Sequence, residues 1–595
     1  MKFEQHLIDL TIEAIHSIFG IEIEAKLVSV QKTNLIYRNE GDFTIVVFPF
    51  TRFSKKSPEE TAQMLGDYLA AHSEIIESYG VVKGFLNLRI LSKYWVGMIQ
   101  KEAEETALPV DNREKILIEF SSPNTNKPLH LGHIRNNLLG WSVSEILKAN
   151  GHDVVRVNLV NDRGIHICKS MLAWEKWGKG ETPESSGIKG DHLAGKYYVL
   201  FDQYYKEEIK SLIASGLTEE EAKQQAPLMQ EAREMLKKWE DNDAEVMQLW
   251  NTMNGWVYEG FDVTYKQMGI SFDKTYYESQ TWQKGKSLVE DALKNGNCYQ
   301  KDDQSVWVDL TAEGLDEKIL LRSDGTSVYM TQDLGTAYIR HNEHQPKQMI
   351  YVVGNEQNYH FDVLKLVLQK KFGFQWAESI FHLSYGMVEL PEGKMKSREG
   401  TVVDADDLME VMIQTAQTTT EELGKTLNFD LDEQTQLYQV LAMGALKYFI
   451  LKVDPVKNIV FNPAESIDFN GHTGPFIQYT HARICSLMKK AGESETASNP
   501  FSSQTPITQK ERQLIQLLYE YPAVVQEAGQ RLSPALIANY AFELAKEYNQ
   551  FYHESPVLKE SDADIRQMRL GISAFTAGII KSAMHLLGIE VPERM

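Results

Sequence analysis

The stretch "KILIEFSSPNTNKPLHLGHIRNN", Lys115–Asn137, decides the fold of this chain. It begins with a short apolar run, Lys115–Phe120, that is typical of a buried strand, and a cluster of turn residues follows it. Apolar residues then recur at helical spacing until Asn150-Gly151, a typical helix end. Asp153–Val160 is a second apolar run of strand length. Strand, turn, helix and strand in this order predict the opening of a parallel, nucleotide-binding sheet.

The composition is that of an ordinary globular protein. The chain has 595 residues, which predicts several domains, and 43% of them are hydrophobic. Because no apolar run is long enough to span a bilayer and the first residues include acids, we expect a cytoplasmic protein without membrane contact. Its three cysteines form no C-x-x-C pair, which argues against a cysteine zinc site. The net charge of −22 argues against nonspecific nucleic-acid coating, but it leaves room for one specific RNA partner.

Three further regions have recognisable patterns. A charged helical pattern from about Trp174 to Trp250 predicts a helical insertion. Sheet-like runs return in "SVWVDL", "MIYVVG" and "IFHLSYG". After about Asp404 the pattern is almost entirely helical, which predicts an all-α region at the end of the sequence.

The two histidines of "HLGH" allow three interpretations. They are ordinary polar residues at a helix start, or, at positions i and i+3, two ligands of a metal for which no third ligand is evident. The third interpretation uses the context, because a helix that starts at the carboxyl edge of a parallel sheet forms an anion site. His130, His133 and Lys127 would then face a polyphosphate, and Gly132 would leave space for a flat ring close to the backbone.

The "HLGH" turn resembles the signature of class I aminoacyl-tRNA synthetases, and its frame "IEFSSPNTNKPLHLGHIRNN" is similar to arginyl-tRNA synthetases. The resemblance implies a multidomain α/β fold with a Rossmann-type parallel-sheet catalytic core. An N-terminal α/β domain that contacts the tRNA elbow would precede the core, and an all-α anticodon-binding bundle would follow. The implied boundaries are 1–110 for the first domain, 111–400 for the core with its insertion at about 174–260, 401–470 for a stem-contact segment and 471–595 for the bundle.

The resemblance also implies an arginine–tRNA ligase that uses ATP with Mg²⁺, needs no zinc and acts as a monomer on L-arginine and tRNA(Arg). Its catalytic residues would be Lys127, His130, Gly132 and His133. The implied ATP-binding residues are Pro123, Asn124, His130, His133, Gly354, His360, Lys394, Lys396 and Ser397. The last three lie in "KMKSR", where the general pattern is K-M-S-K-S and Ser397 replaces the second lysine. Either Lys127 or Lys396 is then the lysine for the leaving pyrophosphate.

A guanidinium substrate requires carboxylates in a planar, bidentate arrangement. Tyr329 and Asp333 are spaced i and i+4, so they share one face if the segment is helical. The resemblance implies that the residues binding arginine are Glu119, Asn124, Glu278, Tyr329, Asp333 and Gln357. Taken singly, each is also explained as a surface or capping polar group.

The resemblance extends to tRNA recognition at both ends of the sequence. Phe85 and Asn87 in "GFLNLRI" are expected to read an unpaired base, although Phe85 also suits a strand core. Phe476, Tyr479 and Arg483 match positions that contact anticodon bases, and core packing is the alternative for them. Met595 would lie near the anticodon.

Three alternatives remain: another synthetase within the same enzyme class, a protein of a different class and a zinc enzyme. A synthetase for another amino acid would not need acids at Glu278 and Asp333. A noncatalytic tRNA-binding protein would bind ATP without turnover, and it would not need the intact histidine turn. A zinc enzyme built on His130 and His133 is the third alternative, and metal analysis would test it.

Overall fold

The computed structural model of the chain folds into two compact units. The described residues are 3–33, 41–101, 113–389, 403–424, 429–492 and 501–595. The first unit contains residues 1–107, 486–520 and 546–578, and the second contains 108–485, 521–545 and 579–595. The domain boundaries inferred from the sequence stay a prediction. None of the helices within the described ranges is both long and apolar enough to cross a membrane.

The first unit is built on an antiparallel sheet with the strand order β1-β2-β4-β3. Its strands are β1 (Val30–Lys32), β2 (Phe43–Val46), β3 (Ile76–Val82) and β4 (Phe85–Ile90). Helices α1 (Phe3–Phe19) and α3 (Pro58–His72) belong to the same unit. A buried ion pair fixes this sheet to a helix distant in sequence, because the guanidinium of Arg512 lies 3.0 Å from the carboxylate of Asp42.

The second unit contains the predicted parallel sheet, and the predicted fold class is confirmed. All pairings in its order β12-β11-β5-β6-β7 are parallel. The strands are β5 (Lys115–Glu119), β6 (Asp153–Val160), β7 (Lys274–Tyr277), β11 (Gln348–Gly354) and β12 (Ile380–Tyr385). The chain proceeds from β5 to one side through β6 and β7 and to the other through β11 and β12. The crevice beyond the carboxyl ends of β5 and β11 is therefore the switch point at which such sheets bind ligands.

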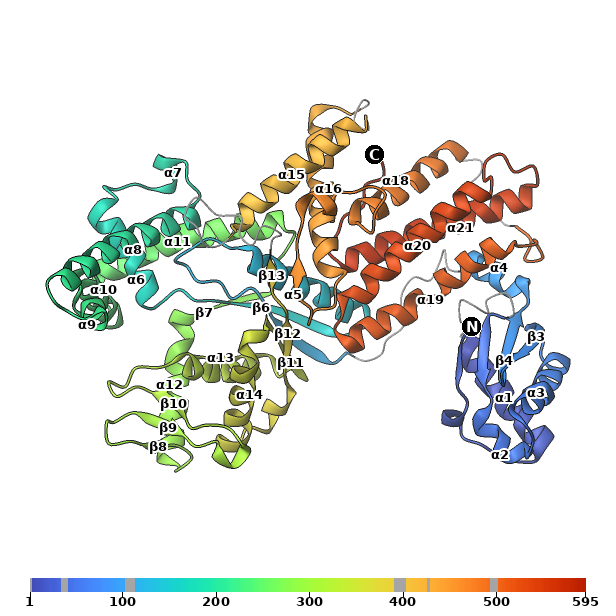
Figure 1. The fold of residues 1–595 in the computed structure, drawn as a ribbon, viewed down its shortest axis with the longest axis horizontal. Helices are drawn as coiled ribbons and strands as arrows, with labels where there is room; N and C mark the ends of the chain where they lie inside the picture. Colours follow the sequence, from blue (N-terminus) through green and yellow to red (C-terminus); the bar gives the residue numbers. More distant parts are fainter. Residues whose placement is uncertain (1–2, 34–40, 102–112, 390–402, 425–428, 493–500) are drawn as a thin grey trace. The chain divides into compact units, whose positions relative to one another are not determined.

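Helices cover both faces of this sheet (Figure 1). Leu117 of β5 packs in one core cluster with Leu334 and Ala337 of α13 (Tyr329–His344) and with Val363 of α14 (Asn358–Leu366). Helix α5 (Leu131–Ala149) contacts β5, β6 and β11. An added Cβ at Gly140 of α5 would lie 2.2 Å from the ring of Phe120, so a side chain there would force α5 away from the sheet.

The predicted helical insertion lies between β6 and β7. It consists of α6 (Ile165–Trp177), α7 (Pro183–Ser186), α8 (Gly190–Ala214), α9 (Glu219–Gln225), α10 (Pro227–Glu240) and α11 (Ala244–Gln267). Its members share a separate core of apolar side chains that includes Met171, Leu193 and Ala232. The insertion is therefore a small helical body with its own core.

Between β7 and β11 the chain forms α12 (Glu278–Lys294), the antiparallel strands β8 (Tyr299–Gln300), β9 (Val306–Val308) and β10 (Lys318–Leu321), and α13. After the sheet come β13 (Val388–Glu389), α15 (Ala405–Glu422), α16 (Leu431–Leu451), β14 (Ile459–Val460) and α18 (Gly474–Ala491). The last long helices are α19 (Gln509–Arg531), α20 (Pro534–Glu554) and α21 (Ala563–Leu586), and each has residues in both units.

Candidate active site

The two histidines cap the N-terminus of α5. His130 is the residue before the helix, and its Nδ1 accepts the backbone N–H of Gly132 at 3.1 Å. The Nδ1 of His133 accepts the backbone N–H of His130 at 3.2 Å. The ring centroids lie 4.0 Å apart. Each imidazole therefore satisfies one N–H group that the helix start leaves without a partner, as capping serines and acids do elsewhere.

Burial keeps both rings neutral, and the capping hydrogen bonds decide which ring nitrogen carries the proton. Burial, aided by the charge of Lys127, lowers the pKa of His130 to about 4 and that of His133 well below its ordinary value. Both imidazoles are neutral near pH 7, and because each Nδ1 accepts a hydrogen bond, the single ring proton must reside on Nε2. The turn thus holds two Nε2–H donors beside Lys127, whose own pKa is lowered by burial. Such an arrangement stabilises negative charge without transferring a proton.

Gly132 is required by the fold of the turn itself. An added Cβ would lie 2.9 Å from Cε1 of His130, which is closer than real Cβ contacts. A side chain at this position would push the imidazole away from its cap. The sequence-based interpretation of Gly132 invoked only space for a ligand, whereas the structure adds this internal reason.

The loop between β5 and α5 leaves the sheet through two residues with positive φ, Ser121 (81°) and Ser122 (49°). Their backbone N–H groups donate to the side-chain oxygens of Asn136 and Asn158 at 2.5 and 3.0 Å. These buried amides hold a backbone conformation that residues with a Cβ rarely adopt.

Beyond these serines, the predicted ATP-binding residues Pro123 and Asn124 continue beside β6. The carbonyl of Pro123 accepts the N–H of Asn161 at 2.8 Å, and the N–H of Thr125 donates to the carbonyl of Asn161 at 3.1 Å. Pro123 is buried and Asn124 is exposed. The side chain of Asn124 is therefore available to a ligand, as the sequence-based hypothesis requires.

The predicted acids for a guanidinium lie at the start of α12 and in the first turns of α13. Glu278 is 6% exposed, and its carboxylate accepts a hydrogen bond of 2.6 Å from Nε2 of Gln332. Burial raises its pKa to about 7, because Arg163 offsets this effect only in part and Asp162 and Asp333 add to it. Asp333 pairs with Nε2 of His360 at 2.6 Å. The structure thus brings Glu278, Asp333 and His360 into one region and leaves Glu278 short of positive charge.

Glu119, which was predicted to bind arginine, has its carboxylate engaged within the protein. Its carboxylate forms a buried ion pair with Arg340 of α13 and accepts the hydroxyl of Ser122 at 2.8 Å. The ion pair fixes α13 to the end of β5. Sequence reasoning missed Arg340, and the only local signal was an arginine beside the apolar stripe of Leu334 and Ala337.

Three other residues predicted to bind arginine or ATP lie at the start of a helix or at the end of a strand. Tyr329, the first residue of α13, is 73% exposed, so most of its side chain faces solvent. Gly354 is the last residue of β11, and Gln357 is exposed just after it. Lys394, Lys396 and Ser397 lie outside the described residues.

A residue of the quoted stretch that received no role, Arg135, has a clear structural one. Its guanidinium is buried and donates to four backbone carbonyls, at 2.6 to 3.0 Å. The acceptors are Gly386, Met387, Pro455 and Lys457. Arg135 therefore attaches α5 to the two segments that form the small parallel pair of β13 and β14.

Comparisons with known proteins show the family to which the chain belongs. A family model described as tRNA synthetases class I (R), catalytic domain, matches residues 98–463, and a DALR anticodon binding domain matches 477–595. The arginine–tRNA ligase of Phocaeicola vulgatus is 56% identical over 609 residues, and that of Parabacteroides distasonis is 55% identical over 603. Both alignments cover all of this chain and all of the relative. The chain belongs to the arginyl-tRNA synthetase family.

Solved structures support the fold of this arginyl-tRNA synthetase family member. The arginyl-tRNA synthetase of Thermus thermophilus has a TM-score of 0.78 at 24% identity, with all of both chains covered. The Plasmodium falciparum enzyme has a TM-score of 0.75 at 20% identity, covering 100% of this chain and 99% of that one. At such identities the likeness concerns the fold alone.

The two residues expected to read an elbow base lie on β4 of the first unit. Phe85 is half-buried and packs edge-on against Phe48, with ring centroids 5.4 Å apart. Asn87 is 3% exposed, and its side-chain oxygen accepts the hydroxyl of Thr44 at 2.6 Å. In this conformation the side-chain amide of Asn87 is not accessible to RNA. Its predicted contact with RNA would therefore require a rearrangement.

The residues expected to contact the anticodon are placed on α18 and just after α21. Tyr479 and Arg483 lie together, with the guanidinium carbon 4.8 Å from the centre of the tyrosine ring. Phe476 is half-buried and packs on Phe542 at 5.4 Å between ring centroids. Met595 is half-buried. The α18 pair keeps both of its predicted interpretations, core packing and RNA contact.

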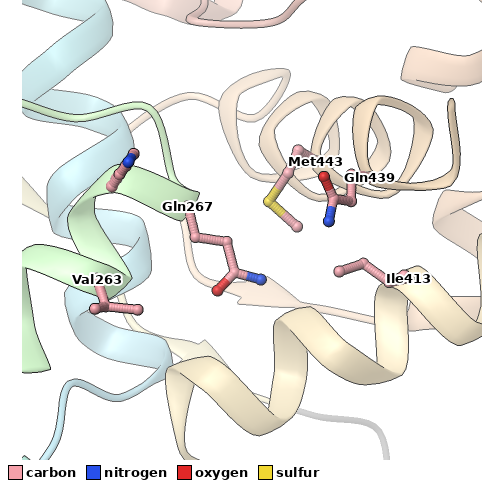
Figure 2. A pocket seen from close by; sticks show the side chains of 6 residues that line it. Val263, Gln267, Ile413, Gln439 and Met443 are labelled. Carbon is pink, nitrogen blue, oxygen red and sulfur yellow. The ribbon is translucent and has the colours of Figure 1, made fainter. Parts of the chain in front are cut away.

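A shallow hollow of 470 Å³ lies between α11, α15 and α16 (Figure 2). Figure 2 shows Gln267 pointing into the space between Met443 and Ile413. Its lining residues are Val263, Lys266, Gln267, Ile413, Gln439 and Met443. The sequence-predicted residues are not among them, so this hollow is distinct from the histidine turn.

Proposed function

We propose that this family member is an arginine–tRNA ligase that uses its histidine turn to form arginyl-adenylate. The observation that carries the proposal is the pair of neutral imidazoles at the start of α5, next to Lys127 and at the switch point of the sheet. In the first step the carboxylate of L-arginine would attack the α-phosphate of ATP, and the bond to pyrophosphate would break. The Nε2–H groups of His130 and His133 would donate to the α-phosphate oxygens as their charge grows.

The acids at α12 and α13 support arginine as the amino acid. A buried carboxylate whose charge is only partly offset by a cation, as Glu278 is by Arg163, is complementary to a guanidinium, and Asp333 would provide the second acid. We further propose that the exposed amide of Asn124 contacts the amino acid and that Gln357 and Tyr329 close over it once it binds. Glu119 would act through its ion pair with Arg340 and would orient α13 against the turn.

Magnesium would arrive with ATP. The carboxylate next in sequence to the turn, Glu119, is already paired with Arg340, so the phosphate oxygens and water suit the ion better than this side chain does. The bound ion would neutralise phosphate charge. The chain's own residues would position the triphosphate through Lys127, the backbone at Gly354 and His360.

In the second step the 2′-hydroxyl of the terminal adenosine would attack the arginyl carbonyl, and AMP would leave. The match of residues 477–595 to an anticodon binding domain supports tRNA(Arg) as the acceptor, with Tyr479 and Arg483 as contacts. The monomeric state remains a prediction, which sedimentation of the purified chain would test.

Arginine-dependent exchange of labelled pyrophosphate into ATP tests the proposal. It is measured with and without total tRNA, beside a panel of other amino acids and the neutral analogue citrulline. We expect exchange with arginine in the presence of tRNA and more than about a hundredfold discrimination against citrulline, because it would leave a buried acid unpaired. ATP binding without exchange for any amino acid would favour a noncatalytic RNA-binding protein instead.

A further inference from the structure

A cluster of charged side chains joins the helical insertion to the start of α15. The ammonium of Lys189, just before α8, lies 2.6 Å from Oδ2 of Asp406, 3.1 Å from Oδ2 of Asp191 and 2.5 Å from the hydroxyl of Thr264. Asp406 also contacts Nε2 of His192 at 2.8 Å, and its Oδ1 accepts the hydroxyl of Thr264 at 2.9 Å. Asp191 is fully buried. The cluster thus connects α8, α11 and α15 by direct polar contacts.

These contacts do not form an empty metal site. Ligand atoms of Asp191, His192 and Asp406 lie within 4.8 Å of one another, a spacing that would suit a metal ion. However, the ammonium of Lys189 contacts both carboxylates. The protein supplies its own cation there, so a structural role for the cluster fits better than a metal-binding one.

The start of α15, where Asp406 lies, is also joined to the histidine turn by backbone hydrogen bonds. Segment 403–405 runs beside segment 129–131, and two N–H···O bonds of 3.0 Å connect them. His130 and Asp404 face each other across this antiparallel bridge. The carboxylate of Asp404 then accepts the N–H of Asp406 at 2.8 Å and begins the helix. A single residue, Ala405, therefore separates Asp404, the partner of His130, from Asp406, whose carboxylate binds Lys189.

A second contact links α8 to the turn independently of charge. A Cβ added at Gly195 would lie 3.0 Å from Cδ of Pro128 and 3.7 Å from Cα of Lys127. Helix α8 can approach the residues before the histidines this closely because position 195 has no side chain. The insertion thus supports the turn from Pro128 on one side and through Asp406 on the other.

We propose that Lys189 and Asp406 are positioning residues that hold the histidine turn in its reactive orientation. This inference rests on the proposed function, because the orientation matters for the attack on the α-phosphate. The helical insertion would then serve catalysis directly. The arginine-binding acids lie on α12 and α13, which the cluster does not touch, so binding of arginine should be spared.

The test compares Lys189→Met with Lys196→Met. Lys196 lies on α8, and its ammonium pairs with Glu181 at 2.7 Å on a partly exposed surface, so its substitution removes the same charge from a position close in sequence to Lys189. For Lys189→Met we expect kcat of arginine-dependent exchange to fall about tenfold or more, with KM for arginine within about twofold. Lys196→Met should match the wild type. Lys189→Arg should recover most of the lost kcat, because it restores a cation beside Asp406.

Amide hydrogen exchange gives a readout that does not depend on activity. The N–H groups of Leu131 and Ala405 should exchange faster in Lys189→Met and in Asp406→Asn, which keeps the shape of the side chain, but not in Lys196→Met. Unchanged kcat and unchanged exchange at these amides would overturn the inference, as would an equal loss of kcat in the Lys196 control. If the wild-type chain shows no arginine-dependent pyrophosphate exchange, the proposed function fails, and the amide readout still decides whether the cluster holds the turn.

Discussion

Substituting Glu278 by glutamine should have opposite effects on stability and on activity. The buried carboxyl has a pKa of about 7 in the folded protein instead of its ordinary 4.5. The folded state therefore binds this proton more tightly than the unfolded state does, and the contribution of this carboxyl to the free energy of unfolding falls as pH rises from about 4.5 to about 7. Above that range the full cost persists, at about 3 kcal/mol from about 1.4 kcal/mol per pKa unit.

Glu278→Gln removes this cost, because an amide carries no charge and can still accept the hydrogen bond from Gln332. The variant should be more stable than the wild type by up to about 3 kcal/mol at about pH 8.5, and nearly equal to it at about pH 4. The same change should lower kcat/KM for arginine at least about a hundredfold, since the guanidinium loses its buried partner. Denaturant unfolding at the two pH values and pyrophosphate exchange measure these effects.

Proton release upon arginine binding provides a second measurement. At about pH 7 roughly half of the Glu278 carboxyls are protonated, and a bound guanidinium would ionise them, so binding should release about half a proton. Calorimetry in two buffers of different ionisation enthalpy detects this release. A variant that is less stable than the wild type at the higher pH, or wild-type binding without proton release, would refute the reasoning.

Three further substitutions probe the turn. Gly132→Ala should fold but lose most of its pyrophosphate exchange, because the new Cβ displaces the His130 ring; a melting curve beside the exchange assay separates the two effects. Lys127→Ala should lower the rate of adenylate formation more than it weakens arginine binding, and equal effects in rapid-quench and equilibrium-binding measurements would contradict its assignment to the phosphates. Arg135→Met should reduce the free energy of unfolding by about 3 kcal/mol or more, since two buried and two partly buried carbonyls lose their donor, and chemical denaturation checks this value.

The sequence predicted those parts of the fold that depend on local patterns. The order of β5, turn, α5 and β6 is confirmed, because apolar spacing and turn residues act over a few neighbours. The apolar run "FTIVVFPF", residues 43–50, is typical of one strand, but the strand ends at Val46 and residues Phe48–Phe50 form a 3₁₀ helix. Pro49 lacks the N–H group that a strand ladder would use, which explains the early end.

Contacts between distant segments could not be predicted. Glu119 and Arg340 are 221 positions apart, and neither has a neighbour whose pattern indicates the other. Asn87 lies between Leu86 and Leu88, and all three side chains are buried. Because neighbouring residues of a strand point to opposite faces, the apolar–polar alternation predicts that Asn87 faces solvent, and its burial could not be predicted from the sequence. The sites that depend on such pairings emerge only from the tertiary structure.

The segment after α21 has a consequence for the biosynthesis of the protein. The backbone carbonyls of every second residue from 586 to 592 accept hydrogen bonds from side chains. These side chains precede their acceptors by 444, 141, 112 and 111 positions in the sequence. The donors are Ser142, Lys447, Gln478 and His481. The ribosome makes α5 long before it makes the acceptor for Ser142, and at about 5–20 residues per second the wait lasts roughly 20 to 90 s. During translation these four donors therefore lack their acceptors, and the folding of the second unit is completed only after residues 586–592 have been made.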